Sequence, residues 1–193
     1  VPILKGRSLR PKDAATVLVI RRDGPSPRVL MGRRAKGHVF MASKWVFPGG
    51  RLHPADFRVA AASELHADTA SRLNLTAPAP RARALAAAAV RELFEETGVR
   101  ADLVDILARS KEEHFYDLPD DMIGRIWKGK YRGQRQIWFL MRFKGSDSDI
   151  NIETAHQEFT SWQWVDALMV PQLIVPFKKR LYENILAEFA DLI

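Results

Sequence analysis

The sequence Arg-Glu-Leu-Phe-Glu-Glu-Thr-Gly-Val at residues 91–99 decides the fold. In a helix, Glu92, Glu95 and Glu96 stand at positions i, i+3 and i+4, so their carboxylates lie on one side. Like charges at that spacing repel one another, and Arg91, four residues before Glu95, offsets part of the repulsion. Three neighbouring carboxylates provide hard oxygen ligands, which bind Mg²⁺ or Mn²⁺ more readily than they bind soft metals. A row of helical glutamates is more often a solvated surface, so the flanking sequence has to decide between the two interpretations.

The flanking residues predict a helix over 81–97. Pro80 stands near the first turn, where proline is tolerated, and Gly98 stands where a helix ends. The side of this helix opposite the glutamates carries small and apolar residues that can pack closely against a sheet. These are Ala86, Ala89, Val90, Leu93 and Thr97.

Apolar runs on both sides of this helix predict the strands of one mixed sheet. Residues 14–20 form a β-branched apolar run, and residues 28–33 return after a turn as its hairpin partner. Further strands are predicted at 45–50, 103–107, 134–143 and 161–165. A second helix is predicted at 177–189, where large apolar residues recur every four positions. We see no repeats and no linker, so we expect a single α/β domain over residues 1–193.

The motif residues resemble the signature of the Nudix hydrolase superfamily, G-x5-E-x7-R-E-U-x-E-E-x-G-U, in which U is a bulky aliphatic residue. Residues 91–99 match the second half of the signature at every position. Gly50 matches the first glycine, and Asp56 stands where the family has its first glutamate. Between Asp56 and Arg91 there are 34 residues instead of seven, so an insertion of 27 residues splits the signature. The resemblance implies an α/β/α sandwich with a mixed sheet and an insertion, at about 57–80, inside the motif.

Two parts of the chain resemble different branches of that superfamily. Residues 10–98, including the sequence FPGGRLHPAD at 47–56, are similar to relatives of the coenzyme A diphosphatases. The segments YDLP at 116–119, KYRGQRQ at 130–136 and IVPFK at 174–178 are similar to bacterial RNA pyrophosphohydrolases and diadenosine polyphosphate hydrolases.

The resemblance implies the metal site and the catalytic residues. Mg²⁺, with Mn²⁺ as a substitute, is expected to bind the three helical glutamates, Glu92, Glu95 and Glu96, and a carbonyl of Gly49 or Gly50. Glu158 is expected to serve as a further ligand or as the general base, although a surface acid before a strand is an alternative interpretation. Arg91 is expected to orient the carboxylates, so the catalytic set is Glu95, Glu158 and Arg91.

Substrate binding is expected from a second group of residues. The resemblance implies that Val175 and Phe177 sandwich a base, although Phe177 alone would be interpreted as a core residue of the last helix. Basic side chains are expected to contact phosphates or an RNA backbone. They are Arg10, Arg33, Arg132, Arg135 and Lys178. Trp138, Trp162 and Trp164 lie in strand-like runs and are more typical of core, and the five histidines show no metal-ligand spacing.

Composition narrows the class of protein. The 193 residues carry a net charge of +7, and the first 51 hold twelve Lys and Arg against only Asp13 and Asp23. This excess predicts one positive face for a polyanion, or simply a solvated basic surface. The absence of cysteine excludes disulfides, thiolate nucleophiles and cysteine-ligated metals. Without a membrane-length apolar run or a signal-like start, we expect a cytoplasmic protein that does not bind membranes.

Three functions remain open at this point. The first is a Mg²⁺-dependent pyrophosphohydrolase acting on nucleoside polyphosphates, either dinucleoside polyphosphates such as diadenosine tetraphosphate or 5′-triphosphate RNA ends. The second is a coenzyme A or acyl-coenzyme A diphosphatase, and the third is a non-catalytic module that binds nucleotides or RNA. The sequence does not decide the oligomeric state.

Overall fold

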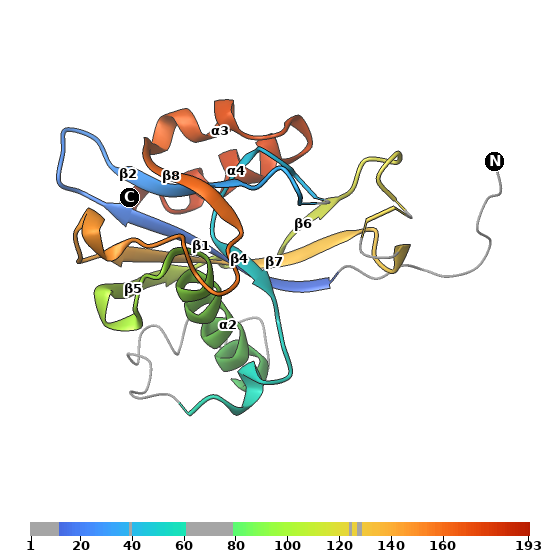
Figure 1. Ribbon diagram of the computed structural model, residues 1–193, viewed down its shortest axis with the longest axis horizontal. Coiled ribbons are helices and arrows are strands. Elements are labelled where there is room, and N and C mark those ends of the chain that lie inside the picture. The colour runs from blue at the N-terminus through green and yellow to red at the C-terminus, as the bar shows by residue number, and fades with distance from the viewer. Residues whose placement is uncertain (1–11, 39, 61–78, 124, 127–128) are drawn as a thin grey trace.

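A mixed sheet with helices on both faces forms the centre of the molecule (Figure 1). The computed structural model describes residues 12–38, 40–60, 79–123, 125–126 and 129–193. Helix α2 (Ala79–Thr97) lies against one face of the sheet, whereas α3 (Val170–Leu173) and α4 (Pro176–Glu188) lie against the other. The expected α/β/α sandwich is therefore confirmed.

The sheet has eight strands in the described part of the chain. Its main order is β3-β2-β1-β7-β5, with β4 beside β1, β6 beside β7 and β8 beside β2. Strands β1 and β7 are parallel and the other pairs are antiparallel, which makes the sheet mixed. The strands are β1 (Lys12–Arg21), β2 (Arg28–Arg34), β3 (Trp45–Val46), β4 (Gly49–Arg51), β5 (Val104–Arg109), β6 (His114–Asp117), β7 (Gly133–Phe143) and β8 (Phe159–Asp166). Short 3-10 turns are η1 (Asp56–Arg58), η2 (Ala101–Leu103), η4 (Asp147–Asp149), η5 (Ala167–Met169) and η6 (Ala190–Leu192).

Strand β1 supplies both halves of the core because successive strand residues point to opposite faces. Val17 and Val19 pack in the cluster that contains the buried alanines and leucines of α2. Leu18 and Ile20 pack in the other cluster, which contains the buried side of α4. All four side chains are fully buried, which explains why residues 14–20 read as a continuous apolar run. Small residues on α2 let that helix lie close to the sheet, as the sequence predicts.

Several predicted elements differ in detail from the structure. The single strand predicted at 45–50 is two strands, β3 and β4, because Pro48 separates them and Gly49 has a φ of +151° that favours glycine. Strand β6 and helix α3 were not predicted, since each has only four residues and shows little periodicity. Most of the expected insertion, residues 61–78, lies outside the described residues.

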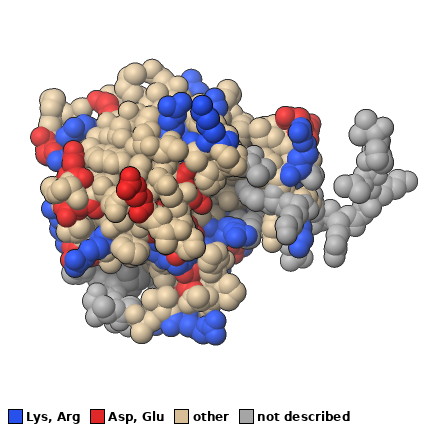
Figure 2. All heavy atoms as spheres, in the orientation of Figure 1, with Lys and Arg blue, Asp and Glu red and all other residues tan. Residues whose placement is uncertain are grey.

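Basic and acidic side chains lie beside one another at several places in the described part of the chain. Basic residues of the first two strands form ion pairs with acids, among them Arg21 with Asp147 and Arg34 with Glu158. On the face shown in Figure 2, the described Lys and Arg side chains are interspersed with Asp and Glu. The single positive face expected from composition is therefore not seen on this side of the described molecule. Separately, no described helix combines the length and the apolarity that a membrane crossing requires.

We predict that Gly32→Ala destabilises the fold by about 1–3 kcal/mol, the usual cost of overpacking a core. A Cβ atom at Gly32 in β2 would lie 2.2 Å from the ring of Phe159, which is fully buried and cannot move aside. Gly24→Ala is the matched control, because a Cβ there meets no atom within 4 Å. Urea denaturation measures both variants. Equal stability of the two would contradict the packing described for this sheet.

Candidate active site

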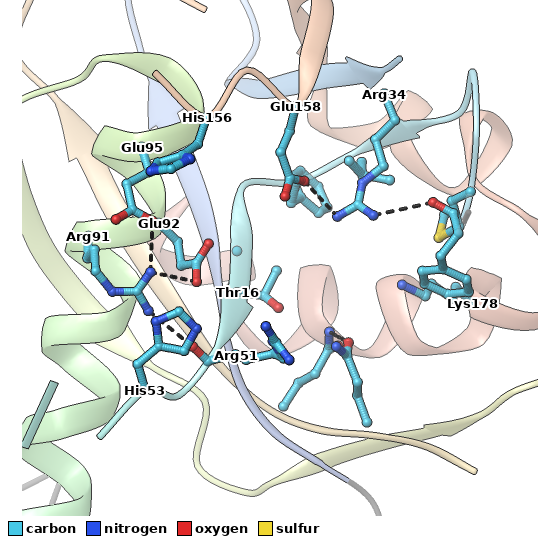
Figure 3. Close-up of a pocket in the computed structure, with 18 of the residues that line it drawn as sticks. Thr16, Arg34, Arg51, His53, Arg91, Glu92, Glu95, His156, Glu158 and Lys178 are labelled. Carbon is cyan, nitrogen blue, oxygen red and sulfur yellow. Dashed lines mark hydrogen bonds and ion pairs between the residues drawn. The ribbon is translucent and has the colours of Figure 1, made fainter. Parts of the chain in front are cut away.

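A cavity of about 740 Å³ lies where the second half of α2 approaches β1 and β4. Figure 3 shows Glu92, Glu95 and Arg91 on one side of this cavity and Arg34 and Lys178 on the other. The cavity brings together an acidic half and a basic half from segments that are distant in the sequence. Its other linings include Gly49, Gly50, Arg51, His53, Gln134, Gln136, His156, Glu158 and Tyr182.

The guanidinium of Arg91 organises the acidic half. Its Nη1 donates to Glu92 Oε1 at 2.8 Å and to Glu95 Oε2 at 2.9 Å, and its Nη2 donates to the carbonyl of Arg51 at 3.0 Å. Its Nε also donates to Asp56 Oδ1 at 2.9 Å. The hydrogen bonds that Arg91 donates to Asp56 and the negative charge of Glu92 raise the pKa of Arg91, so this cation stays charged. One positive group thus offsets the repulsion within the glutamate row, as the sequence predicts.

Asp56 has the role that the sequence left open. The residue is buried and also accepts a hydrogen bond from the backbone N–H of His53 at 2.7 Å. Burial alone would raise the pKa of Asp56, but the hydrogen bonds from Arg91 and His53 outweigh it and lower the pKa. The carboxylate therefore stays charged and holds Arg91 in place. In this structure Asp56 is a positioning residue.

The glycine bend of β4 touches the carboxylates directly. The N–H of Gly49 donates to Glu96 Oε2 at 3.0 Å. A Cβ atom at Gly50 would lie 2.3 Å from the carboxyl carbon of Glu92, so only glycine allows this approach. The backbone of β4 therefore lies directly against the carboxylates of α2.

Burial disfavours the charged form of the two most buried acids, Glu92 and Glu96. Burial raises the pKa of Glu92 and, together with the nearby Glu158, raises the pKa of Glu96 well above its usual value. Glu158 lies just before β8, and its Oε2 is buried without a hydrogen bond, although Arg34 Nη2 is 3.3 Å away. A buried acceptor in this state is costly unless a cation or another donor satisfies it.

The residues present fit a divalent cation. Among the residues that the structure describes, no three His, Asp or Glu side chains already have the arrangement of a metal site. Arg91 instead bridges Glu92 and Glu95, and Gly49 holds Glu96. The donor set is nevertheless entirely hard oxygen, from carboxylates and a glycine backbone, which is the chemistry that Mg²⁺ and Mn²⁺ prefer. Glu158 adds a further carboxylate, whose Oε2 is ion-paired with Arg34 but accepts no hydrogen bond.

The basic half of the cavity was predicted only in part. Lys178, which the sequence analysis expected to contact phosphates, lines it, and its Nζ lies 4.2 Å from the ring centre of Tyr116 and 5.3 Å from that of Phe40. Burial and the nearby Arg34 lower the pKa of Lys178 to about 7. Arg34 also lines the cavity and was not predicted. The sequence analysis named its neighbour Arg33, which is exposed and does not line the cavity, because adjacent strand residues point to opposite faces.

The other predicted substrate residues lie outside the cavity lining. Arg132 is exposed and pairs with Asp117, and Arg135 pairs with Asp13 and Glu113. Val175 and Phe177 are partly buried beside α4, where the Phe177 ring lies 5.9 Å from the ring of Tyr116. Arg10 lies outside the described residues. Of the three tryptophans expected in the core, Trp138 is fully buried, whereas Trp162 and Trp164 are only partly buried.

Comparison with known proteins decides the family. A NUDIX domain model matches residues 78–185, more than half of the chain. The chain belongs to the Nudix family. The matched range begins where the expected insertion ends, and it contains the complete second half of the signature and Glu158.

Curated Nudix relatives and solved structures support this assignment. The chain is 63% identical over 106 residues to an RNA pyrophosphohydrolase of Sphingopyxis alaskensis, a match that covers 55% of this chain and 67% of the relative. It is 58% identical over 108 residues to an RNA pyrophosphohydrolase of Novosphingobium aromaticivorans, covering 55% and 66% respectively. The chain thus spans about two thirds of the length of these relatives.

The structural comparison shows the same fold at low identity. An Ap4A hydrolase binary complex from C. elegans superimposes with a TM-score of 0.58 and 17% identity, covering 94% of this chain and 99% of that one. The E. coli dihydroneopterin triphosphate pyrophosphohydrolase gives a TM-score of 0.57 at 17% identity, covering 92% and 98%.

We predict that Lys178→Met stabilises this Nudix protein by about 1–4 kcal/mol at and below pH 7. The folded pKa of Lys178 is about 7, below the ordinary value of 10.5. Between pH 7 and pH 10.5, Lys178 is protonated in the unfolded chain but largely neutral in the folded protein, so the free energy of unfolding rises with pH. Below pH 7 the lysine is charged in both states, and the full cost of burying that charge lowers the stability. The gain should therefore fade towards pH 10.5. Urea denaturation over this pH range tests it, with the exposed neighbour in Lys179→Met as control; a pH-independent gain would contradict the burial of a titrating lysine.

Proposed function

We propose that this Nudix protein hydrolyses a phosphoanhydride bond in nucleoside polyphosphates, either dinucleoside polyphosphates such as diadenosine tetraphosphate or the 5′-triphosphate ends of RNA. The observation that carries the proposal is a cavity with neighbouring carboxylates on one side and the basic side chains of Arg34 and Lys178 on the other. Such a cavity suits a polyphosphate chain, because the negative charge of the phosphates has to be neutralised before water can attack.

The acidic side of the cavity would hold the divalent metal ion. Nudix hydrolases generally need such an ion, and we propose Mg²⁺, with Mn²⁺ as a substitute. Glu92, Glu95 and Glu96 would bind it, together with Glu158 and a carbonyl of Gly49 or Gly50. When bound, the ion neutralises phosphate charge that otherwise repels the nucleophile.

The chain's own groups would then orient the substrate and move the proton. Arg34 and Lys178 face the carboxylates across the cavity and can donate to phosphate oxygens (Figure 3). Arg91 keeps the glutamates in position and does not contact substrate. Glu95 or Glu158 would accept the proton of the attacking water, since their side chains retain 37% and 35% exposure and can reach it.

The relatives support this substrate class. Those reported above are two RNA pyrophosphohydrolases, an Ap4A hydrolase and a dihydroneopterin triphosphate pyrophosphohydrolase, and each name denotes an enzyme that acts on RNA or on a nucleotide-like compound. Action in the cytoplasm is part of the same proposal. Five residues expected to bind substrate do not line this cavity, and they would contact only a substrate that extends beyond it. They are Arg33, Arg132, Arg135, Val175 and Phe177.

We predict that Glu95→Gln combined with Glu96→Gln lowers kcat on the order of 100-fold or more, because two ligands of the proposed cation lose their charge. Hydrolysis is measured with Mg²⁺ or Mn²⁺ on diadenosine tetraphosphate, triphosphorylated RNA, coenzyme A and ADP-ribose, and the products are identified by mass spectrometry. Glu183→Gln, an exposed acid on α4, is the control. Retained turnover in the double variant would refute the site. Cleavage of coenzyme A alone would favour the diphosphatase alternative.

A further inference from the structure

A second cavity, of about 700 Å³, adjoins the candidate active site. His53 lines both cavities, so the two meet at this residue. The second cavity, here called the side cavity, is further lined by Phe57, Arg58, Tyr131 and Arg135. Neither the family assignment nor the relatives' names attribute a role to Phe57, Arg58 or Tyr131.

One wall of the side cavity is a hydrogen-bonded turn that is held to α2 by an ion pair. After β4 the chain forms η1, in which the Asp56 N–H donates to the His53 carbonyl at 3.0 Å and the Arg58 N–H donates to the Ala55 carbonyl at 2.9 Å. The buried ion pair of Asp56 with Arg91 anchors this turn to α2. The contact that orients the glutamates therefore also fixes one wall of the side cavity.

The chemistry of the side cavity suits an aromatic base with an adjacent phosphate. Phe57 exposes 52% of its surface here, so its ring is accessible to a base. Tyr131 supplies a second aromatic side chain. Arg58 is exposed at the rim, where a guanidinium can pair with phosphate, whereas the charge of Arg135 is already neutralised by Asp13 and Glu113.

The position of the side cavity identifies which base it would take. Arg34 and Lys178 form one end of the active-site cavity, and His53 lies beside Arg91 at the opposite end (Figure 3). A polyphosphate that spans the carboxylates from the Arg34 end would therefore direct its far end towards His53. A 5′-triphosphate carries no base at its far end, whereas a dinucleoside polyphosphate carries one at each end.

Building on the proposed function, we propose that the side cavity binds the second nucleoside of a dinucleoside polyphosphate. The base lies against Phe57 and Tyr131, and Arg58 pairs with the phosphate nearest to it. Contact of a base with an aromatic ring strengthens binding by about 5- to 150-fold. The side cavity thus favours substrates with nucleosides at both ends over those with one.

The test compares diadenosine tetraphosphate with adenosine 5′-tetraphosphate, which has the same phosphates but lacks the second nucleoside. We expect Phe57→Ala to raise KM for diadenosine tetraphosphate at least about fivefold, with little change in kcat, and to leave adenosine tetraphosphate unaffected. Phe57→Tyr, which keeps the ring, should restore KM. Arg58→Ala should have a smaller effect that disappears at high salt.

Two matched controls lie outside both cavities. Phe94→Ala removes a ring with 53% exposure from the outer side of α2, and Arg22→Ala removes an exposed guanidinium after β1. Neither should change the ratio of kcat/KM between the two substrates. Equal effects of Phe57→Ala on both substrates, or no effect on either, would overturn the proposal.

A binding measurement separates this proposal from the proposed function. Calorimetric titration with a methylene-bridged, uncleavable analogue of diadenosine tetraphosphate does not depend on turnover. If the wild type hydrolyses nothing but binds this analogue more tightly than Phe57→Ala does, the proposed function fails and the side cavity stands. If both proteins bind the analogue equally, the side cavity is refuted whatever the hydrolysis data show.

Discussion

The structure of the candidate site depends on one guanidinium. Arg91 contacts Asp56, Glu92 and Glu95, and without it the acids on this side of α2 would repel one another in a partly buried space. The buried pair with Asp56 also joins the turn after β4 to α2. Removing one partner of such a pair is costly, because the other charge stays buried and alone. Active-site geometry and local folding therefore share the same interaction.

The sheet brings the remaining parts of the site to this point. The parallel pairing of β1 with β7 places Gln134 and Gln136 beside the cavity, and β4 presents its glycines to α2. Strand β2 carries Arg34 to the opposite wall. Because Asp56 and Arg91 meet in space, the 34 residues between them do not disturb the signature that they interrupt. A long insertion is tolerated when both of its ends are held in this way.

The sequence predicted what local spacing controls. The i, i+3, i+4 pattern of Glu92, Glu95 and Glu96 and the alternation within β1 follow from backbone periodicity, and the structure reproduces both. It could not predict contacts between distant segments, such as the hold of Asp56 on Arg91. The sequence analysis chose Arg33 instead of its neighbour Arg34. In a strand an error of one residue is decisive, because adjacent side chains point to opposite faces of the sheet. The sequence did not predict the side cavity either, because the cavity forms where the turn after β4 meets residues near the start of β7, which are distant in the sequence.

The most direct test of the account is the binding of Mn²⁺ itself, followed by electron paramagnetic resonance without any substrate. The free Mn²⁺ signal should fall when the wild-type protein is added, and it should recover when Glu92 and Glu96 are both replaced by glutamine. A parallel denaturation curve confirms that this variant is folded. If the folded variant removes as much Mn²⁺ from solution as the wild type does, the acidic side of the cavity is not a metal site.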